Sequence, residues 1–525
     1  MCKRKHKHSN GFIKSASSLI LAIFIARIIG AVHRLPLAHI LEPAGMGLYQ
    51  LVFPVYAFLL SASSGSLPIA ISMLVSSRLA NAETNKAREI LKTAMSALLL
   101  TSLVLSFVLA ILSGPIGKLQ GNSDTKLGFI CIAPAVFFTS GIAVMRGWFQ
   151  GNSNMLPSAI SQITESVAKL VVGLALAWLL LPYGIAYAVG GALAGVTISE
   201  ALTFLLLYLV YRKNNPPLKL DLNIKKARSQ YKEILKLTIP MTLGGLILPL
   251  SQIADSLIAL NVRVANSNQA LATVNYGLYT GYVGTLINFP IMVALSLGIA
   301  VAPLLSKDKA QHNIIAIKDK IKSASKMAFF ASAPFTALYI AIPESILSLL
   351  YPSISTIDLL TASLLLRVSA VSVIALSATQ IYASTLQGLG FYYKPVRSML
   401  FAVCAKIVLG VFLSSRIGIL GIAIASCVCF FVAGFANYVS IIRLTGNLRS
   451  ILQCCIIITI TSIIAGVTLV TIDKFTDANG VCLLSALAIS IVYCLTLILL
   501  GVFTDRELTG LPGSKILLKL SHLIK

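Results

Sequence analysis

Long apolar segments alternate with short polar connections along the whole chain. About 14 segments reach the roughly 20 residues that a helix needs to cross the hydrocarbon core of a bilayer. They lie near residues 12–33, 46–77, 90–113, 127–148, 158–181, 185–210, 234–260, 273–304, 325–343, 358–388, 396–415, 418–442, 451–472 and 480–503. A single segment in lipid satisfies its own backbone hydrogen bonds only as a helix. The pattern therefore predicts an all-α, polytopic membrane protein with about 14 transmembrane helices.

The second half of the chain repeats features of the first half, so that residues 147–212 correspond to residues 384–446. The matched positions include Gln150 and Gly151 with Gln387 and Gly388, Pro157 with Pro395, Lys169 with Lys406, and Gly47, Leu48 and Tyr49 with Gly277, Leu278 and Tyr279. Each copy holds six predicted spans. Because six is even, both copies insert in the same orientation, as parallel repeats.

The repeat predicts how the chain is divided. The predicted parts are an N-terminal six-helix lobe at 1–211, a cytoplasmic linker at 212–236, a C-terminal six-helix lobe at 237–446, two extra helices at 447–503 and a cytoplasmic tail at 504–525. Two like lobes that face each other suit a transporter that works by alternating access. A purely structural duplication is the alternative.

Composition agrees with a membrane protein, since 57% of the 525 residues are hydrophobic and 11% are charged. The net charge of +25 raises the question of nucleic-acid binding. With the N-terminus in the cytoplasm, however, roughly three quarters of the Lys and Arg residues fall on the inner side, as the positive-inside rule requires. The charge therefore indicates topology, with both termini cytoplasmic and no nucleic-acid partner.

The predicted linker is strongly basic and contains two adjacent prolines, Pro216 and Pro217. Its later part places Ile224, Tyr231 and Leu235 on one helical face. A basic amphipathic helix of this kind lies on anionic membrane lipids. The alternative is an ordinary solvated loop.

Four glycines and prolines occupy matched places in the second and eighth predicted spans: Gly65, Pro68, Gly284 and Pro290. A proline inside a helix removes one hydrogen bond and bends the helix. Bends at matched places in two lobes are candidate hinges. Static kinks that serve only packing are an equally good interpretation.

Ionisable residues within the spans are candidate functional residues, because a charge at mid-helix costs at least about 2.5 kcal/mol unless it is paired or hydrated. They are Arg27, Glu165, Lys169, Glu200, Asp255, Arg367 and Lys406. Glu165 and Lys169 are spaced i,i+4 and are expected to pair along one helix face. Glu200 is expected to form a structural pair, and the approximate depths of Asp255 and Lys406 allow a pair between helices.

Arg27 has no acidic residue nearby in the sequence, and His33 and Arg34 follow it by one to two turns. An unpaired guanidinium in a span favours a water-filled cavity and binds phosphate through two parallel hydrogen bonds. We therefore predict that Arg27, His33 and Arg34 line a cavity for an anionic substrate. A buried structural charge is the alternative for Arg27.

Motifs of covalent chemistry are absent from the sequence. It contains no Walker A loop, HExxH, GxSxG or dinucleotide fingerprint, and its His and Cys residues lack the spacing of metal ligands. The sequence therefore predicts a protein that is not an enzyme and has neither a catalytic residue, a metal site nor a cofactor. Without an ATP site, ion gradients, the membrane potential or the substrate gradient would drive transport.

Several segments resemble the stage V sporulation protein B group of the multidrug/oligosaccharidyl-lipid/polysaccharide flippase superfamily. They include RIIGAVHRLPLAHILEPAGMGLYQL (27–51), RGWFQGNSNMLPSAISQITESVAKL (146–170) and TLQGLGFYYKPVRSMLFAVCAKIVLG (385–410). The superfamily also contains MurJ-type lipid II flippases and MATE drug antiporters. The resemblance implies a flippase in the bacterial plasma membrane that moves an undecaprenyl-pyrophosphate-linked sugar for peptidoglycan or another envelope polymer, beside envelope glycosyltransferases.

The resemblance also implies roles for particular residues. Arg27 matches the first cavity arginine of MurJ-like proteins, and His33 or Arg34 matches the second, whereas the other two matching positions are not basic here. Asp255 is similar in place to an acid of a sodium site in those proteins. Lys406 stands near the position of its missing partner, so we predict that the Lys406 ammonium replaces bound sodium.

Two other functions remain open from the sequence. A cation-coupled exporter of small drugs would require acidic groups in the first-lobe cavity, where Arg27 stands instead. A membrane scaffold for envelope synthesis would tolerate Arg27→Ala without loss of activity.

Overall fold

The computed structural model describes residues 2–216, 224–262, 268–446, 449–475 and 479–503, and within these ranges it contains helices and no strand. The all-α prediction is therefore confirmed. Packing divides the chain into two compact units, Met1–Gly281 and Tyr282–Lys525. The sequence repeat instead divides the chain at the predicted linker 212–236. The two divisions need not agree, because the repeat is defined by matched sequence and the units by contacts in the folded chain.

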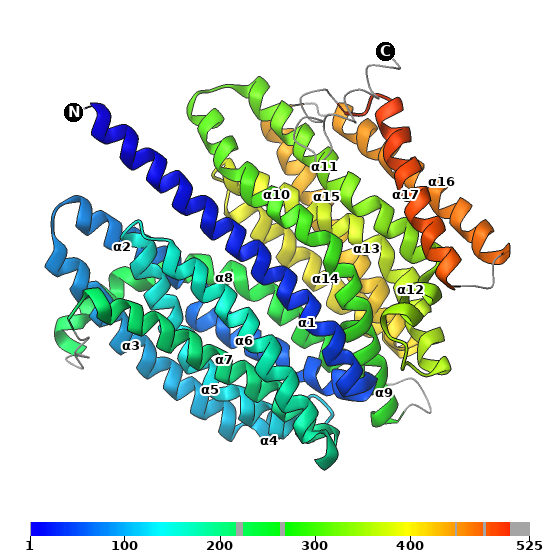
Figure 1. Ribbon diagram of the computed structural model, residues 1–525, viewed down its shortest axis with the longest axis horizontal. Helices are drawn as coiled ribbons and strands as arrows, with labels where there is room; N and C mark the ends of the chain where they lie inside the picture. The colour runs from blue at the N-terminus through cyan, green and yellow to red at the C-terminus, as the bar shows by residue number, and fades with distance from the viewer. Residues whose placement is uncertain (1, 217–223, 263–267, 447–448, 476–478, 504–525) are drawn as a thin grey trace. The chain divides into compact units, whose positions relative to one another are not determined.

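The described part of the first unit contains nine α-helices, shown from blue to green in Figure 1. They are α1 (Cys2–Ser64), α2 (Leu67–Ala80), α3 (Thr84–Ile111), α4 (Ser113–Leu119), α5 (Thr125–Gly151), α6 (Leu156–Leu180), α7 (Ile185–Asn214), α8 (Ile224–Asn261) and α9 (Gln269–Gly277). A 3₁₀ turn at Leu181–Tyr183 joins α6 to α7.

The second unit contains eight described α-helices, after a π-helical segment at Leu278–Val283 that spans the division between the units. They are α10 (Gly284–Ala310), α11 (Ile314–Ala341), α12 (Pro343–Leu350), α13 (Thr356–Gly388), α14 (Tyr393–Ile417), α15 (Ile419–Thr445), α16 (Arg449–Phe475) and α17 (Asn479–Leu499).

The number of membrane spans depends on how bent helices are counted. By length and hydropathy, 11 described helices qualify, or 12 when α11 and α12, which meet at 95°, count as one broken span. The segment Ala22–Ala80 counts once, although its 59 residues would extend about 90 Å, roughly three times the hydrocarbon thickness. The count of 14 stays a prediction, and part of the difference comes from this segment.

The long segment has identifiable breaks. At Glu42, inside α1, the backbone is non-helical with φ 54°, and Pro43 follows. A residue before proline is pushed out of the helical region, so the chain turns here. A second break at Gly65 and Ser66 separates α1 from α2.

The predicted linker 212–236 falls partly outside the described residues, since residues 217–223 are not described. On either side, α7 continues to Asn214 and α8 begins at Ile224. The predicted amphipathic helix and the following span therefore form one continuous helix, α8. The predicted tail at 504–525 lies outside the described residues.

The core of the first unit lies among α2, α3, α5 and α7, where Ile71, Leu91, Val144 and Leu207 are buried together. Helix α5 is central, since α1, α2, α3 and α7 all pack against it. Many large apolar side chains, such as Phe107 of α3, remain exposed. In a membrane protein this surface faces lipid tails.

The core of the second unit lies among α10, α11, α13 and α15, where Ile321, Ile381 and Ile441 are buried together. A further cluster joins α11 to the C-terminal pair α16 and α17 through Ile458 and Leu497. The two helices that have no counterpart in the repeat are therefore docked on the second unit.

Candidate functional site

Basic residues of α1 include Arg27, which is exposed, Arg34, which is half-buried, and His33, which is 6% exposed. Neither arginine forms an ion pair with any residue that the structure describes. Among the described residues, the two guanidinium groups are thus not compensated by an acidic side chain.

His33 faces helix α6. A Cβ atom placed on Gly173 would lie 3.4 Å from His33 Nε2, so the imidazole packs directly on the α6 backbone. His33 Nε2 is buried and has no hydrogen-bond partner within the described part of the chain. Of the three predicted cavity residues, His33 is therefore enclosed by α6, whereas Arg27 remains accessible.

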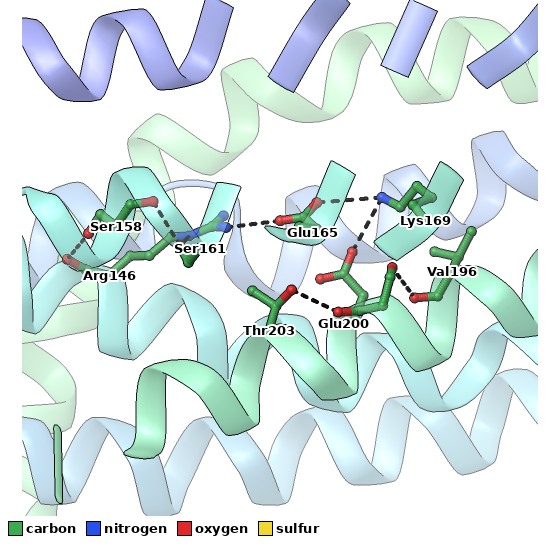
Figure 2. A network of polar contacts seen from close by, with 9 residues as sticks. Arg146, Ser158, Ser161, Glu165, Lys169, Val196, Glu200 and Thr203 are labelled. Carbon is green, nitrogen blue, oxygen red and sulfur yellow. Dashed lines mark hydrogen bonds and ion pairs between the residues drawn. The ribbon is translucent and has the colours of Figure 1, made fainter. Parts of the chain in front are cut away.

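A network of charges, buried at Glu200 and half-buried at its other members, joins α5, α6 and α7 (Figure 2). Arg146 of α5 donates from Nε to Ser161 Oγ and from Nη2 to Glu165 Oε2, both at 2.9 Å. Lys169 Nζ lies 3.4 Å from Glu165 Oε1, as the i,i+4 spacing predicts. The same ammonium lies 3.5 Å from Glu200 Oε1 of α7. Lys169 therefore bridges two carboxylates from different helices.

The network is electrically neutral, because Arg146 and Lys169 balance Glu165 and Glu200. Its enclosure is uneven, since the side chain of Glu200 is 3% exposed and that of Lys169 is 24% exposed. Removing one member of a buried ion pair leaves its partner as an uncompensated charge, which is strongly destabilising. The arrangement therefore holds the three helices together with little net field.

The hydroxyl group of Ser161 holds the Arg146 side chain at one end of the network. Ser161 Oγ, which accepts from Arg146, itself donates to the carbonyl oxygen of Ser158 at 2.8 Å. On α1, which packs against both α6 and α7, the Tyr56 hydroxyl is buried and has no hydrogen-bond partner among described residues.

Sequence reasoning predicted three of the four charged members and missed Arg146, which lies near the end of the fourth predicted span, 127–148. A signal was available in the hairpin that α5 and α6 form. Residues equidistant from the loop of an antiparallel pair lie side by side, and Arg146 and Ser161 are equidistant from the loop at 152–155. The long arginine side chain then reaches Glu165, one turn further along α6.

Three other predicted charges belong to other helices: α8, α13 and α14. Asp255 of α8 and Lys406 of α14 are both buried, but they belong to different compact units, so the predicted pair stays a prediction. Arg367 lies 3.7 Å from Glu344, and both side chains are about half exposed. Such exposed pairs contribute little to stability.

The predicted hinge residues all lie at or near helix irregularities. Gly65 lies in the break between α1 and α2, and Pro68 lies in the first turn of α2. Gly284 begins α10 directly after the π-helical segment, and Pro290 lies inside α10. Their role in movement stays a prediction.

The chemistry open to this site is binding and charge compensation. In the described part of the chain, no group of three or more His, Cys, Asp and Glu side chains is placed to hold a metal ion. Phosphate groups would be attracted to the α1 arginines, whereas the network on α5, α6 and α7 is already satisfied.

Comparison with known proteins gives two family matches. The profile of the polysaccharide biosynthesis protein family matches residues 12–309, and that of the MatE family matches residues 240–413. Two relatives come from Bacillus subtilis (strain 168). Stage V sporulation protein B is 26% identical over 347 residues, which are 65% of this chain and 67% of that protein. The lipid II flippase MurJ is 23% identical over 465 residues, or 85% of each.

Solved structures show the same fold. A lipid II flippase MurJ in an inward closed conformation superposes with a TM-score of 0.71 at 15% identity, covering 91% of this chain and 97% of that one. An inward-facing MATE family multidrug resistance transporter gives 0.68 at 15% identity, covering 82% and 98%. The resemblance predicted from residues 27–51, 146–170 and 385–410 is confirmed by these matches.

Proposed function

Because the chain belongs to the polysaccharide biosynthesis protein family, we propose that it moves an undecaprenyl-pyrophosphate-linked sugar from the inner to the outer leaflet by alternating access. More broadly, it is a multi-pass membrane protein of the flippase and transporter superfamily that includes MurJ and MATE proteins. Lipid II or a related precursor of the cell envelope is the proposed substrate, and the bacterial plasma membrane is the proposed location.

The observation that carries this proposal is the uneven compensation of charge in the first unit. Arg146, Glu165, Lys169 and Glu200 neutralise one another, whereas Arg27 and Arg34 form no ion pair with described residues. An isolated charge at the centre of a helix costs at least about 2.5 kcal/mol in a bilayer. A pyrophosphate group offers oxygens that pair with guanidinium in the bidentate geometry and would offset this cost.

The experiment is flipping of fluorescent lipid II in proteoliposomes by the wild type and by Arg27→Ala. We expect Arg27→Ala to lose most of the protein-dependent flipping, because the head group loses a cationic contact. Arg367→Ala is the matched control, since it removes an exposed arginine that pairs with Glu344 in the second unit. Equal flipping by wild type and Arg27→Ala would contradict a role of Arg27 in binding.

A cation-coupled drug exporter is the second candidate, favoured by the MatE match over residues 240–413. Such an exporter needs an accessible acidic group for a cationic drug. In the first unit, Glu165 and Glu200 are already bound by Lys169 and Arg146. If the wild type moves neither lipid II nor another prenyl-linked glycan but expels ethidium from vesicles, the exporter replaces the flippase.

A further inference from the structure

Two lysines of the second unit converge on one aromatic ring. Lys309 Nζ, near the end of α10, lies 4.9 Å from the centroid of the Phe391 ring, and Lys394 Nζ, in the first turn of α14, lies 4.4 Å from it. Lys309 Nζ also donates to the carbonyl oxygen of Leu389 at 2.6 Å. An ammonium group near an aromatic ring face is attracted by the ring's quadrupole. Phe391 therefore holds two like charges close together.

The two ammonium groups have no acidic partner in the described part of the chain. Asp308, which is adjacent to Lys309 in the sequence, pairs with Lys320 instead. The first turn of α14 contains no acidic residue. Each ammonium has three N–H donors, so both lysines keep donors for another acceptor. Two neighbouring cations repel each other, and an anion bound between them would relieve this repulsion.

The first unit has the same turn as the one that carries Phe391, but with a different side chain. Asn154 N donates to the carbonyl oxygen of Phe149 at 2.9 Å, and Phe391 N donates to that of Leu386 at 2.8 Å. The residue before each has a positive φ, 58° in the first unit and 81° in the second. Asn154 and Phe391 therefore occupy equivalent places, and only the second unit has an aromatic ring there.

The turn that follows Lys309 is also duplicated. Ala82 N donates to the carbonyl oxygen of Leu79, and His312 N donates to that of Lys309, both at 3.0 Å. Ala82 and His312 have positive φ angles of 59° and 54°. Leu79 is therefore the counterpart of Lys309. The backbone can be built without a lysine at this place, so the structure of the turn does not explain Lys309.

Charge is also balanced differently in the two units near these turns. In the first unit, the Glu83 carboxylate pairs with Arg78 at 3.5 Å and with Lys86 at 2.7 Å. In the second unit, the residue that follows His312 is Asn313, which has no charge. The pair of lysines at Phe391 is therefore a property of the second unit alone.

The surroundings of the two lysines favour a ligand that comes from the membrane. Tyr392 and Tyr393, next to Phe391, are 65% and 72% exposed. Tyrosine is enriched at membrane–water interfaces. Helix α14 is long and apolar enough to span the membrane, and Leu400 and Phe401 on it are exposed. The lysines thus lie at the end of a helix whose exposed apolar surface suits lipid chains.

We propose that Lys309, Phe391 and Lys394 bind the phosphate of an anionic phospholipid in the inner leaflet. The two ammonium groups donate to the phosphate oxygens, and the ring keeps both groups in place. The acyl chains lie along the exposed apolar side chains of α14. The charge distribution along the sequence predicts that this end of the unit faces the cytoplasm, where anionic lipids attract basic residues. The site does not depend on which substrate the protein moves.

The test places a fluorescent reporter beside the site. Tyr393→Trp is introduced into the full-length chain, which is reconstituted in phosphatidylcholine nanodiscs that contain increasing fractions of brominated phosphatidylglycerol. Bromine quenches tryptophan at short range, and the signal of the chain without the reporter is subtracted because Trp148 and Trp178 are also present. We expect half-maximal quenching at a much lower fraction of brominated phosphatidylglycerol than of brominated phosphatidylcholine.

The double variant Lys309→Gln with Lys394→Gln should lower the apparent affinity for brominated phosphatidylglycerol roughly twentyfold. This value follows because each lysine near anionic lipid contributes a factor of roughly five. The matched control is Lys307→Gln with Lys318→Gln, which removes the same charge from the same unit. In the described structure, neither of these lysines lies over an aromatic ring. Equal losses in the two double variants would replace the site by a general attraction to positive charge, and would overturn the proposal.

Lys309 also binds a backbone carbonyl oxygen, so its replacement can disturb the turn at Leu389. Lys394 makes no such bond in the described structure, and Lys394→Gln alone should lower the affinity roughly fivefold. Lys394→Arg should keep the affinity, because arginine also binds phosphate and stacks on aromatic rings. An unchanged affinity in Lys394→Gln would contradict the site. Displacement of the lipid by inorganic phosphate would assign the lysines to a soluble anion and would overturn the choice of a lipid.

Discussion

The two repeats place a lysine at the same position, but the surroundings of Lys169 and Lys406 differ. Lys169 in the first unit lies between Glu165 and Glu200, at 3.4 and 3.5 Å. Lys406 in the second unit is 5% exposed and makes contacts of its own. Those contacts cannot include counterparts of the two carboxylates, because the repeat has Ala402 in place of Glu165 and glycine in place of Glu200.

Packing takes the place of charge in the second unit. Gly434 corresponds to Glu200, and a Cβ atom placed on it would lie 3.0 Å from Thr379 Oγ1 of α13. Thr379 Oγ1 in turn lies 2.8 Å from the carbonyl oxygens of Ala375 and Phe430. At the position of Glu200, the second unit therefore joins α15 to α13 by close approach, whereas the first unit joins α7 to α6 through an ion pair with Lys169.

The difference shows that a duplicated fold need not duplicate its electrostatics. Small residues and close packing are one way to join helices in lipid, and paired polar groups are another. The first unit uses both at α6 and α7, since Lys169 pairs with Glu200 and Gly195 lies against the backbone of Gly173. Residues that differ between the repeats, not residues that match, are where a function specific to one lobe should be sought.

The strongest test of this contrast is Lys169→Met, which removes the cation between two carboxylates. We expect it to lower the free energy of unfolding by about 3 kcal/mol, because Glu200 becomes a buried, uncompensated charge. Thermal unfolding in detergent measures the change. Lys86→Met is the control, since Lys86 pairs with Glu83 at 2.7 Å on an exposed surface, where a pair contributes at most about 1 kcal/mol.

The double variant Lys169→Met with Glu200→Gln restores neutrality to the network. It should be more stable than Lys169→Met alone, since the two substitutions act on one pair and are not additive. Additive losses would show that Lys169 and Glu200 do not interact, and the contrast with Lys406 would disappear.

A smaller effect is expected for Arg146→Lys, which keeps the charge of the network but not its geometry. The guanidinium donates to Ser161 and Glu165 from two different nitrogens, and a lysine ammonium cannot reproduce this planar arrangement. We expect a loss of about 1 kcal/mol, the usual contribution of one hydrogen bond. Arg146→Gln should lose more, because it also removes the charge, and equal losses in the two variants would exclude a role for the charge.

The fold could largely be predicted from the sequence because membrane helices are long and self-contained. Hydropathy alone indicated the all-α membrane fold, since each spanning helix must cross about 30 Å of hydrocarbon. It did not show that the predicted linker helix and the next span form one helix, α8. A basic amphipathic segment and an apolar span differ in hydropathy, but the helical backbone can continue from one into the other. Bends such as that at Glu42 also escaped prediction, because hydropathy is insensitive to a single φ angle.

The site was less predictable, because pairs between helices depend on rotation about each helix axis. The Glu165 and Lys169 pair followed from spacing within one helix, whereas the contact of Lys169 with Glu200 required the packing of α6 on α7. Gly277 also packs so closely on Gly47 that a Cβ atom placed on it would lie 2.6 Å from Gly47 N, and this contact was present in the sequence only as a repeated motif. Nothing in a repeat shows which of its copies touch.

An effect as small as that of Arg146→Lys is expected at the counterpart of Glu200, in Gly434→Ala. Thr379 must move by a few tenths of an ångström to admit the methyl group. Its hydroxyl oxygen already lies within hydrogen-bond distance of two carbonyl oxygens, which restricts that movement. We expect a loss of about 1 kcal/mol in the free energy of unfolding, the lower range for overpacking. Gly245→Ala should instead be neutral or stabilising, because the position is open and alanine is the better helix former. A stabilising Gly434→Ala would mean that this position is not closed by packing, and the second unit would then have room for a partner of Lys406 where the first unit has Glu200.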